Sequence, residues 1–328
     1  MSGAMQVLVC SSLAPDFGGV ALAARDLPEP GPGEVRVAIR AASLNFPDLL
    51  MTEGKYQFKP ELPFTLGMEF SGEVDAVGEG VTGFLKGDAV TGAAKTGAFA
   101  GFALAPAAGL RAKPDALSHA EAAAFGAAYL TAYVALVRRA HLQPGETLLV
   151  HGASGGVGLA AVDMGKLLGA TVIATSASDA KLETVVARGA DFALNVTQGF
   201  RERVKALTGG RGADVIFDPV GGDLFDESVR CIAFDGRLLV IGFTSGRIPS
   251  VDVNMPLIKG FSVVGVRAGE YGRRFPERGR ENIDTIWRWA GEGRLKPHIH
   301  AEVALSDWRS AFEMMRGREV VGKVVLLP

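Results

Sequence analysis

A glycine-rich turn between an apolar run and a helical pattern could bind a phosphate-containing cofactor. Residues 148–150 are apolar, as in a buried parallel strand, and residues 153–158 read ASGGVG. In this A-x-G-x-x-G turn, one glycine lets a pyrophosphate approach the backbone and the last lets the helix pack closely on the strand. The helix N-terminus then presents unpaired N–H groups to the phosphates. The predicted contacts are Ser154, Gly155, Gly156, Val157 and Gly158.

The end of the next apolar run indicates which dinucleotide binds. Sites for NAD place an Asp or Glu at the end of the second strand, where it binds the ribose 2′-hydroxyl. Here residues 173–178 read IATSAS and contain no acid. The hydroxyls of Ser176 and Ser178 and the charge of Lys181 would accept a 2′-phosphate, so NADPH is favoured over NADH. The alternative for Lys181 is a solvated helix charge.

Length and composition bound the class of protein. The chain has 328 residues, enough for two domains, with 48% hydrophobic and 21% charged residues. A net charge of −2 favours neither nucleic acid nor an anionic membrane as partner. Two cysteines cannot form a disulfide framework or a four-cysteine zinc site. No signal segment is evident and no apolar run approaches the roughly 18 residues of a membrane span, so we expect a cytoplasmic enzyme.

Two kinds of pattern divide the chain. Residues 1–126 read as short β segments between turn signals, which predicts a small β barrel or sandwich. Ser118 and Glu121 form a predicted capping box that opens an alanine-rich helical region. Strand and helix patterns then alternate, which predicts a doubly wound parallel sheet over residues 127–266. The further predicted strands are 192–194, 215–217, 237–241 and, at the sheet edge, 262–266; the helices between them are 179–188, 200–207 and 224–232.

The remaining residues, 267–328, are expected to return to the N-terminal domain. Residues 282–292 have one apolar helical face, Ser306 can cap a second helix, and residues 323–327 form a final strand. This tail would make the β domain discontinuous and leave the cofactor domain as an insertion.

Several motifs together resemble one family over nearly the whole length. The chain is similar to the zinc-independent quinone oxidoreductases, the zeta-crystallin-like branch of the medium-chain dehydrogenase/reductase superfamily. The resemblance implies a GroES-like β domain beside a Rossmann domain, NADPH as hydride donor, and a homodimer formed through the edge strands of the cofactor domains. The motifs are SLNFPD (43–48), GMEFSG (67–72), GDAV (87–90), HGASGGVG (151–158), DPVGG (218–222) and GKVVL (322–326).

The resemblance also indicates where relatives hold zinc. Asn45 stands near their cysteine position and Met68 replaces their histidine, and neither is a plausible zinc ligand. His298 and His300 could share one side of a strand, but no third ligand is apparent, so surface or packing roles are favoured. We expect no metal.

The resemblance assigns further site residues. Asn45 and Tyr56 match positions that line the substrate pocket, where an amide and a phenol can donate to a developing oxyanion. The alternatives are a turn-forming Asn45, a packing Tyr56 and, for Val220 and Phe243, ordinary core packing. The remaining predicted cofactor contacts are Thr131, Val220, Gly242, Phe243, Arg318 and Lys323.

These features predict the chemistry. Without zinc there is no Lewis acid to ionise an alcohol, so hydride delivery to an electrophilic carbon of a quinone or an α,β-unsaturated carbonyl is favoured. The partner would be that small-molecule electrophile. A 2-enoyl thioester is the alternative substrate. A non-catalytic, crystallin-like NADPH-binding protein is the alternative of another class, and the lack of a basic stripe argues against RNA binding.

Overall fold

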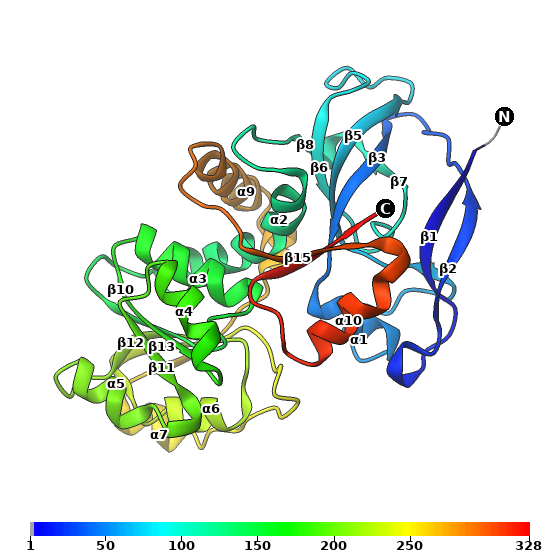
Figure 1. The fold of residues 1–328 in the computed structure, drawn as a ribbon. Coiled ribbons are helices and arrows are strands. Elements are labelled where there is room, and N and C mark those ends of the chain that lie inside the picture. Colours follow the sequence, from blue (N-terminus) through cyan, green and yellow to red (C-terminus); the bar gives the residue numbers. More distant parts are fainter. Residues whose placement is uncertain (1–2) are drawn as a thin grey trace. The chain divides into compact units, whose positions relative to one another are not determined.

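The chain divides into two units, which the computed structural model describes over residues 3–328 (Figure 1). The first unit combines the residues up to Gly126 with Lys296–Pro328, and the second is Ala127–Leu295. Residues 267–295, expected in the returning segment, therefore belong to the second unit.

The first unit is built from two β-sheets. A small sheet has the order β2-β1-β4, from Val20–Asp26, Ala4–Cys10 and Phe64–Thr65. A larger sheet has the order β15-β16-β3-β5-β6-β8, and β7 also pairs with β3. Alternating burial along β3 follows from the pleat, which turns successive side chains to opposite faces. The strands are β15 (Ile299–Ala304), β16 (Lys323–Leu327), β3 (Glu34–Ser43), β5 (Glu69–Val77), β6 (Ala89–Ala93), β8 (Leu110–Ala112) and β7 (Phe102–Pro106).

One helix and a shared sheet connect the C-terminal segment to the rest of the first unit. β16 pairs in antiparallel fashion with the end of β3, so strands far apart in sequence are hydrogen-bonded neighbours. Phe312 of α10 (Trp308–Arg316) packs edge-on against Phe17 and Phe99 with ring centroids 5.2 and 6.2 Å apart. The other helical elements are α1 (Phe46–Thr52), η1 (Pro15–Phe17), η2 (Ala107–Gly109) and η5 (Leu305–Asp307).

A six-stranded parallel sheet is the centre of the second unit. Its order is β11-β10-β9-β12-β13-β14, and all its strand pairs are parallel, as the sequence predicts. Helices cover both faces, with α3 on one and α6 on the other (Figure 1). The strands are β9 (Thr147–Val150), β10 (Thr171–Ser176), β11 (Phe192–Asn195), β12 (Ala213–Asp218), β13 (Ile232–Val240) and β14 (Ser262–Gly265). The connecting helices are α3 (Gly156–Leu167), α4 (Asp179–Ala187), η4 (Val196–Gln198), α5 (Arg201–Leu207), α6 (Gly222–Ser228) and α7 (Asn254–Lys259).

Two further helices, α8 (Ala268–Arg274) and α9 (Pro276–Gly291), explain the shifted domain boundary. Arg138 donates a hydrogen bond to the Asn282 side-chain oxygen and pairs with Glu281 of α9. The rings of Tyr133 and Trp289 lie 5.8 Å apart between centroids. The apolar face of α9 was predicted correctly, but it packs within the second unit.

One helical stretch corrects the expectation about apolar runs. α2 (His119–Tyr133) continues into the π-helical η3 (Val134–Arg139), and together they form a mainly apolar helix of 21 residues. By length and composition this stretch could span a membrane, yet 67% of its apolar window is buried inside the protein. That burial is typical of a core helix. The predicted capping box at its start is confirmed, because Ser118 and Glu121 exchange side-chain-to-backbone hydrogen bonds of 2.8 and 3.2 Å.

Candidate functional site

The predicted glycine turn connects β9 to α3. The helix begins at Gly156, and Gly155 is its extended N-cap residue. A Cβ placed on Gly158 would lie 2.2 Å from the carbonyl oxygen of Gly152, so only glycine allows this close approach. A Cβ on Gly155 would come no closer than 3.4 Å to the same oxygen. The turn thus has one glycine that packing requires and one that leaves space for a ligand.

The end of β10 lies beside this turn. The hydroxyl oxygens of Ser154 and Ser176 are 3.4 Å apart, and the backbone N–H of Ser178 donates to the Ser176 hydroxyl oxygen. Lys181, which is half-buried, follows on the first turn of α4. The structure therefore brings the three predicted serines together, with Lys181 on the helix that they introduce.

An acid that the sequence reasoning missed lies in the same place. Asp179 is the first residue of α4, and its Oδ1 accepts a hydrogen bond of 3.0 Å from the side-chain amide of Asn195. Asn195 ends β11, the parallel neighbour of β10. Asp179 lies beyond the end of β10, one residue after the Ser178 N-cap, so a search for an acid at the strand end alone does not find it.

Two further loops, those after β12 and β13, lie side by side at the same edge of the sheet. The loop after β13 donates backbone hydrogen bonds from Thr244 to Pro219 and from Ser245 to Val220, in the loop after β12. Asp218 Oδ1 accepts the N–H groups of Val220 and the following glycine at 2.8 Å. These bonds hold both loops in fixed conformations.

Three predicted contacts are on these loops. A Val220 methyl carbon lies 3.1 Å from the position of a Cβ on Gly152, so this loop reaches the glycine turn. Gly242 and Phe243 are in the second loop, and Phe243 is 39% exposed. Val220 and Phe243 are therefore not core residues. The sheet order reverses between β9 and β12, and ligands of such sheets bind at this switch point, outside the carboxyl ends of the strands.

A buried histidine supports the turn from inside. His151 Nδ1 is 2.9 Å from the Thr175 hydroxyl and Nε2 is 2.7 Å from the Ser228 hydroxyl. Burial lowers the pKa of this imidazole, which keeps it neutral. His151 is part of the family motif, but its structural role was not predicted.

Two predicted cofactor residues have local constraints of their own. The Thr131 hydroxyl donates to the carbonyl oxygen of Ala127 in its own helix, at 2.7 Å, so only its lone pairs remain for another group. Arg318 is exposed and adopts a left-handed backbone conformation, with φ at 58°. Such conformations in a residue other than glycine are concentrated at functional sites.

In the first unit, the half-buried Asn45 and the buried Lys323 are hydrogen-bonded to each other. Lys323 is 5% exposed, and its ammonium group donates to Asn45 Oδ1 at 2.6 Å. The same ammonium lies 3.9 Å from Glu69 Oε2. Asn45 Nδ2 donates to Glu69 Oε2 at 3.0 Å and to the carbonyl oxygen of Ser43 at 3.2 Å.

This arrangement changes two predicted roles. Both amide hydrogens of Asn45 are already bonded within the protein, so the amide is not a free oxyanion donor. Lys323, predicted to bind the cofactor, instead has its charge buried against Asn45 and Glu69. Tyr56 differs: its ring is half-buried against the core, and within residues 3–328 its hydroxyl makes no hydrogen bond.

Asp48 joins the same cluster. Its Oδ2 accepts the backbone N–H of Asn45, while Oδ1 is buried without a hydrogen-bond partner. Burial raises the pKa of Asp48 to about 7, against the opposing effects of the Asn45 N–H and the Lys323 charge. A protonated carboxyl group suits this environment.

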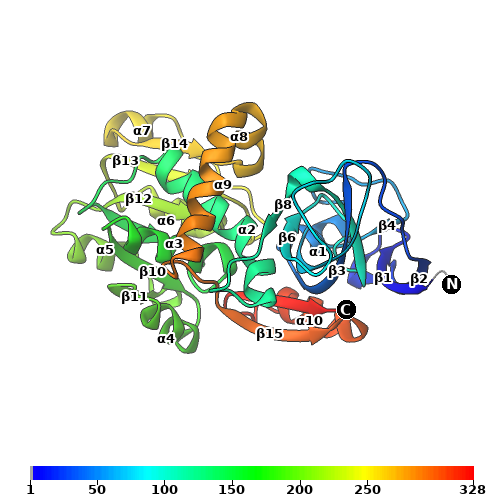
Figure 2. The same cartoon turned by 90° about the horizontal axis from the view of Figure 1, so that it is seen from above.

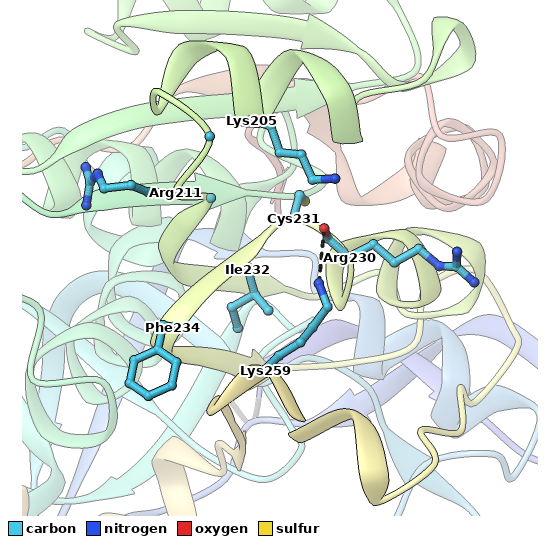
Figure 3. A pocket seen from close by; sticks show the side chains of 9 residues that line it. Lys205, Arg211, Arg230, Cys231, Ile232, Phe234 and Lys259 are labelled. Atoms are coloured by element: carbon cyan, nitrogen blue, oxygen red, sulfur yellow. Dashed lines mark hydrogen bonds between the residues drawn. The ribbon is translucent and has the colours of Figure 1, made fainter. Parts of the chain in front are cut away.

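A separate pocket of about 240 Å³ lies at the opposite edge of the parallel sheet, where β12 and β13 begin (Figure 3). Figure 3 shows the amino group of Lys205 beside Cys231 and that of Lys259 donating to the backbone oxygen of Arg230, while the guanidinium groups of Arg211 and Arg230 point apart. Burial raises the pKa of the Cys231 thiol to about 12, so it is not a nucleophile. This pocket is distinct from the sheet edge formed by the glycine turn after β9 and the loops after β12 and β13, which we call the dinucleotide edge.

Comparison with known proteins agrees with both units. Residues 31–115 match the alcohol dehydrogenase GroES-like domain, and residues 156–287 match the zinc-binding dehydrogenase family. A quinone oxidoreductase-like protein 2 homolog of Nematostella vectensis is 42% identical over 300 residues, 90% of this chain and 82% of that protein. Two solved structures have TM-scores of 0.89. An NAD-dependent alcohol dehydrogenase is 33% identical and covers 98% of this chain and 99% of its own. A mycobacterial protein in complex with NADPH is 31% identical and covers 98% and 100%.

The fold and the dinucleotide edge define a nicotinamide-dependent dehydrogenase or reductase. The chain belongs to the quinone oxidoreductase-like family of the medium-chain dehydrogenase/reductase superfamily. The GroES-like and Rossmann domains that the sequence predicted are thereby confirmed.

The zinc that one family description names does not fit the residues present. Within residues 3–328, no three His, Cys, Asp or Glu side chains gather as a metal site requires. Asn45 has an ammonium group on its oxygen, and the Met68 side chain packs against the hydrophobic core. A divalent cation at Asn45 would meet the positive charge of Lys323.

The two glycines of the turn should respond differently to an added methyl group. Gly158→Ala should lower the free energy of unfolding by about 3 kcal/mol, because its Cβ meets the Gly152 oxygen. Gly155→Ala, the matched control, should leave that free energy nearly unchanged but weaken dinucleotide binding about tenfold or more. Urea unfolding and NADPH fluorescence titration measure the two effects. Equal destabilisation by both variants would contradict this division of roles.

Asp48 should make stability depend on pH. Its folded pKa exceeds the unfolded value, so the folded protein keeps a proton that the unfolded chain loses. Its contribution to stability is full below about pH 4 and is lost as the pH rises to about 7, by up to about 1.4 kcal/mol per pH unit. Asp48→Asn should remove this slope in urea unfolding, whereas Asp115→Asn, at an exposed position, should retain it. A slope unchanged in Asp48→Asn would show that Asp48 is ionised throughout.

Proposed function

We propose that the protein transfers hydride from NADPH to quinones or α,β-unsaturated carbonyl compounds without a metal. The observation that carries this proposal is the state of Asn45, near the metal-ligand position of zinc-dependent relatives. Both amide hydrogens of Asn45 are bonded within the protein, and its oxygen accepts from an ammonium group. Without a Lewis acid the favoured substrate is one whose carbon is already electrophilic.

NADPH, when bound, would supply the hydride and its two electrons. Residues of the second unit would hold it: Gly155 leaves space for the pyrophosphate, and the start of α3 offers unpaired N–H groups. The accepting carbon gains the hydride, the conjugated oxygen gains negative charge, and that oxygen or the adjacent carbon takes a proton from water. Tyr56, with a hydroxyl not engaged elsewhere, is the proposed donor to this oxygen.

The proposed preference for NADPH, which carries a 2′-phosphate, rests on the residues at the end of β10. The hydroxyls of Ser154 and Ser176 lie 3.4 Å apart there, the backbone N–H of Ser178 donates to the Ser176 hydroxyl, and Lys181 supplies a positive charge on α4. Asp179 is close in sequence, but its carboxylate oxygen accepts the Asn195 amide. These contacts support NADPH over NADH.

The function is tested by the rate of cofactor oxidation with a quinone, an alkenal and crotonyl-CoA. The quinone or the alkenal should be preferred, and NADPH should be preferred over NADH. Treatment with a chelator should leave the rate unchanged, because no step needs a metal. Lys181→Ala should raise the KM for NADPH about tenfold and leave that for NADH within about twofold.

Each alternative has its own result in this experiment. A preference for crotonyl-CoA by orders of magnitude would assign enoyl thioester reduction instead. Tight NADPH binding without turnover of any electrophile would indicate a binding protein. Loss of activity with the chelator would overturn metal independence.

A homodimer is proposed from one exposed surface of the second unit. β14 ends the parallel sheet, and within residues 3–328 no strand pairs with its outer edge. α7 and β14 lie together at this end of the sheet (Figure 2). Large exposed apolar side chains surround them, and contiguous patches of this kind mark interaction surfaces. This edge patch consists of Phe234, Val253, Leu257, Ile258 and Val263.

A charge in the edge patch should separate the subunits. Leu257 is 81% exposed in the single chain, and Leu257→Asp should convert a dimer to a monomer in analytical ultracentrifugation. Leu85, in the first unit, is 72% exposed, so Leu85→Asp is the matched control and should leave the dimer intact. A monomeric wild-type protein, or a dimer that persists in Leu257→Asp, would contradict the proposal.

A further inference from the structure

The burial of Lys323 requires a reason. Lysine is almost never fully buried unless it is paired, because the ammonium group loses its hydration. Lys323 is the first residue of β16, so its backbone is fixed by pairing with β15 and its side chain enters the first unit. Its ammonium meets an amide oxygen at 2.6 Å and a carboxylate oxygen at 3.9 Å.

This ammonium determines which way the Asn45 amide faces. An ammonium group has three donors and no acceptor, so only the oxygen of Asn45 can point toward it. The nitrogen must then face Glu69 Oε2 and the Ser43 carbonyl oxygen, which are both acceptors. A reversed amide would place N–H groups against a positive charge.

We propose that Lys323 is a positioning residue of the enzyme: it acts through Asn45, where zinc-dependent relatives place a metal ion. This inference rests on the proposed function. Hydrogen bonds in a chain polarise one another. The positive charge of Lys323 beside Oδ1 therefore makes the N–H groups of the same amide stronger donors. The bond to Ser43 is the longer of the two and its acceptor is uncharged, so that hydrogen is the one that a substrate oxyanion would share.

The test is a double-mutant cycle between positions 45 and 323. Lys323→Met, Asn45→Ala and the double variant are compared with wild type for NADPH-dependent reduction of a quinone. Each single variant should lower kcat about tenfold or more, with the KM for NADPH within about threefold, and the double variant should be no slower than the slower single. Lys323→Arg keeps the charge and should stay within about threefold of the wild-type kcat.

Independent, multiplicative losses would overturn the inference. So would a Lys323→Met variant that changes only the KM for NADPH, because that result would make Lys323 a cofactor ligand. The activity of the wild-type protein distinguishes a failure of the proposed function from a failure of the proposed role of Lys323. An inert wild type rejects the proposed function, whereas an active wild type with independent losses rejects only the role of Lys323.

A second variant keeps the test valid if Lys323→Met does not fold. Asn45→Asp has the same size; one oxygen of its carboxyl group can accept from the ammonium, and the other can donate a proton to Glu69 Oε2. It should fold, as judged by thermal unfolding, and lose about tenfold in kcat because the amide hydrogens are gone. A kcat equal to that of wild type would overturn the inference.

Discussion

The close contact between the start of α3 and the turn after β9 is the constraint on which the dinucleotide edge depends. The Cβ of any other residue at position 158 would overlap the Gly152 oxygen, so the helix can approach the turn only at a glycine. That approach aims the first turn of α3 along the sheet edge, where its N–H groups have no partners within the helix. The loops after β12 and β13 are then fixed to each other by backbone hydrogen bonds, and Val220 reaches the turn. One packing contact thereby sets the position of the N–H groups that are proposed to bind phosphate.

Much of this edge could be predicted from the sequence because its signals are local. An apolar run, a glycine turn and a helical pattern within about 30 residues define the unit without reference to the rest of the chain. The capping box at Ser118 and the doubly wound sheet were predictable for the same reason. The domain boundary was not, because the apolar face of α9 shows that the helix packs but not against which partner. Its partners Tyr133 and Arg138 are far away in sequence.

The cluster of Asn45, Glu69 and Lys323 shows more strongly that contacts between residues distant in sequence are not predictable from local patterns. Lys323 and the Asn45 side chain that it contacts are separated by 278 positions, and nothing local marks either residue as the other's partner. Lys323 is predicted from the sequence to contact the cofactor, and Asn45 to donate to or orient a substrate oxyanion. Neither prediction includes the hydrogen bond between the two side chains. The geometry of a glycine turn can be predicted from its own residues, whereas the partners of a buried ion pair are known only once the sheet is folded.

The cost of burying such a cluster limits what it can be for. Replacing a buried ion pair with apolar residues is often neutral or stabilising, so stability alone does not require Lys323 and Glu69 in the core. Removing one partner is different, because the charge left behind then costs about 3–5 kcal/mol. The pair is completed by β16, which pairs with the end of β3 just before Asn45. The C-terminal strand thus delivers a positive charge to one defined amide, and its contribution is the orientation of that amide rather than the stability of the fold.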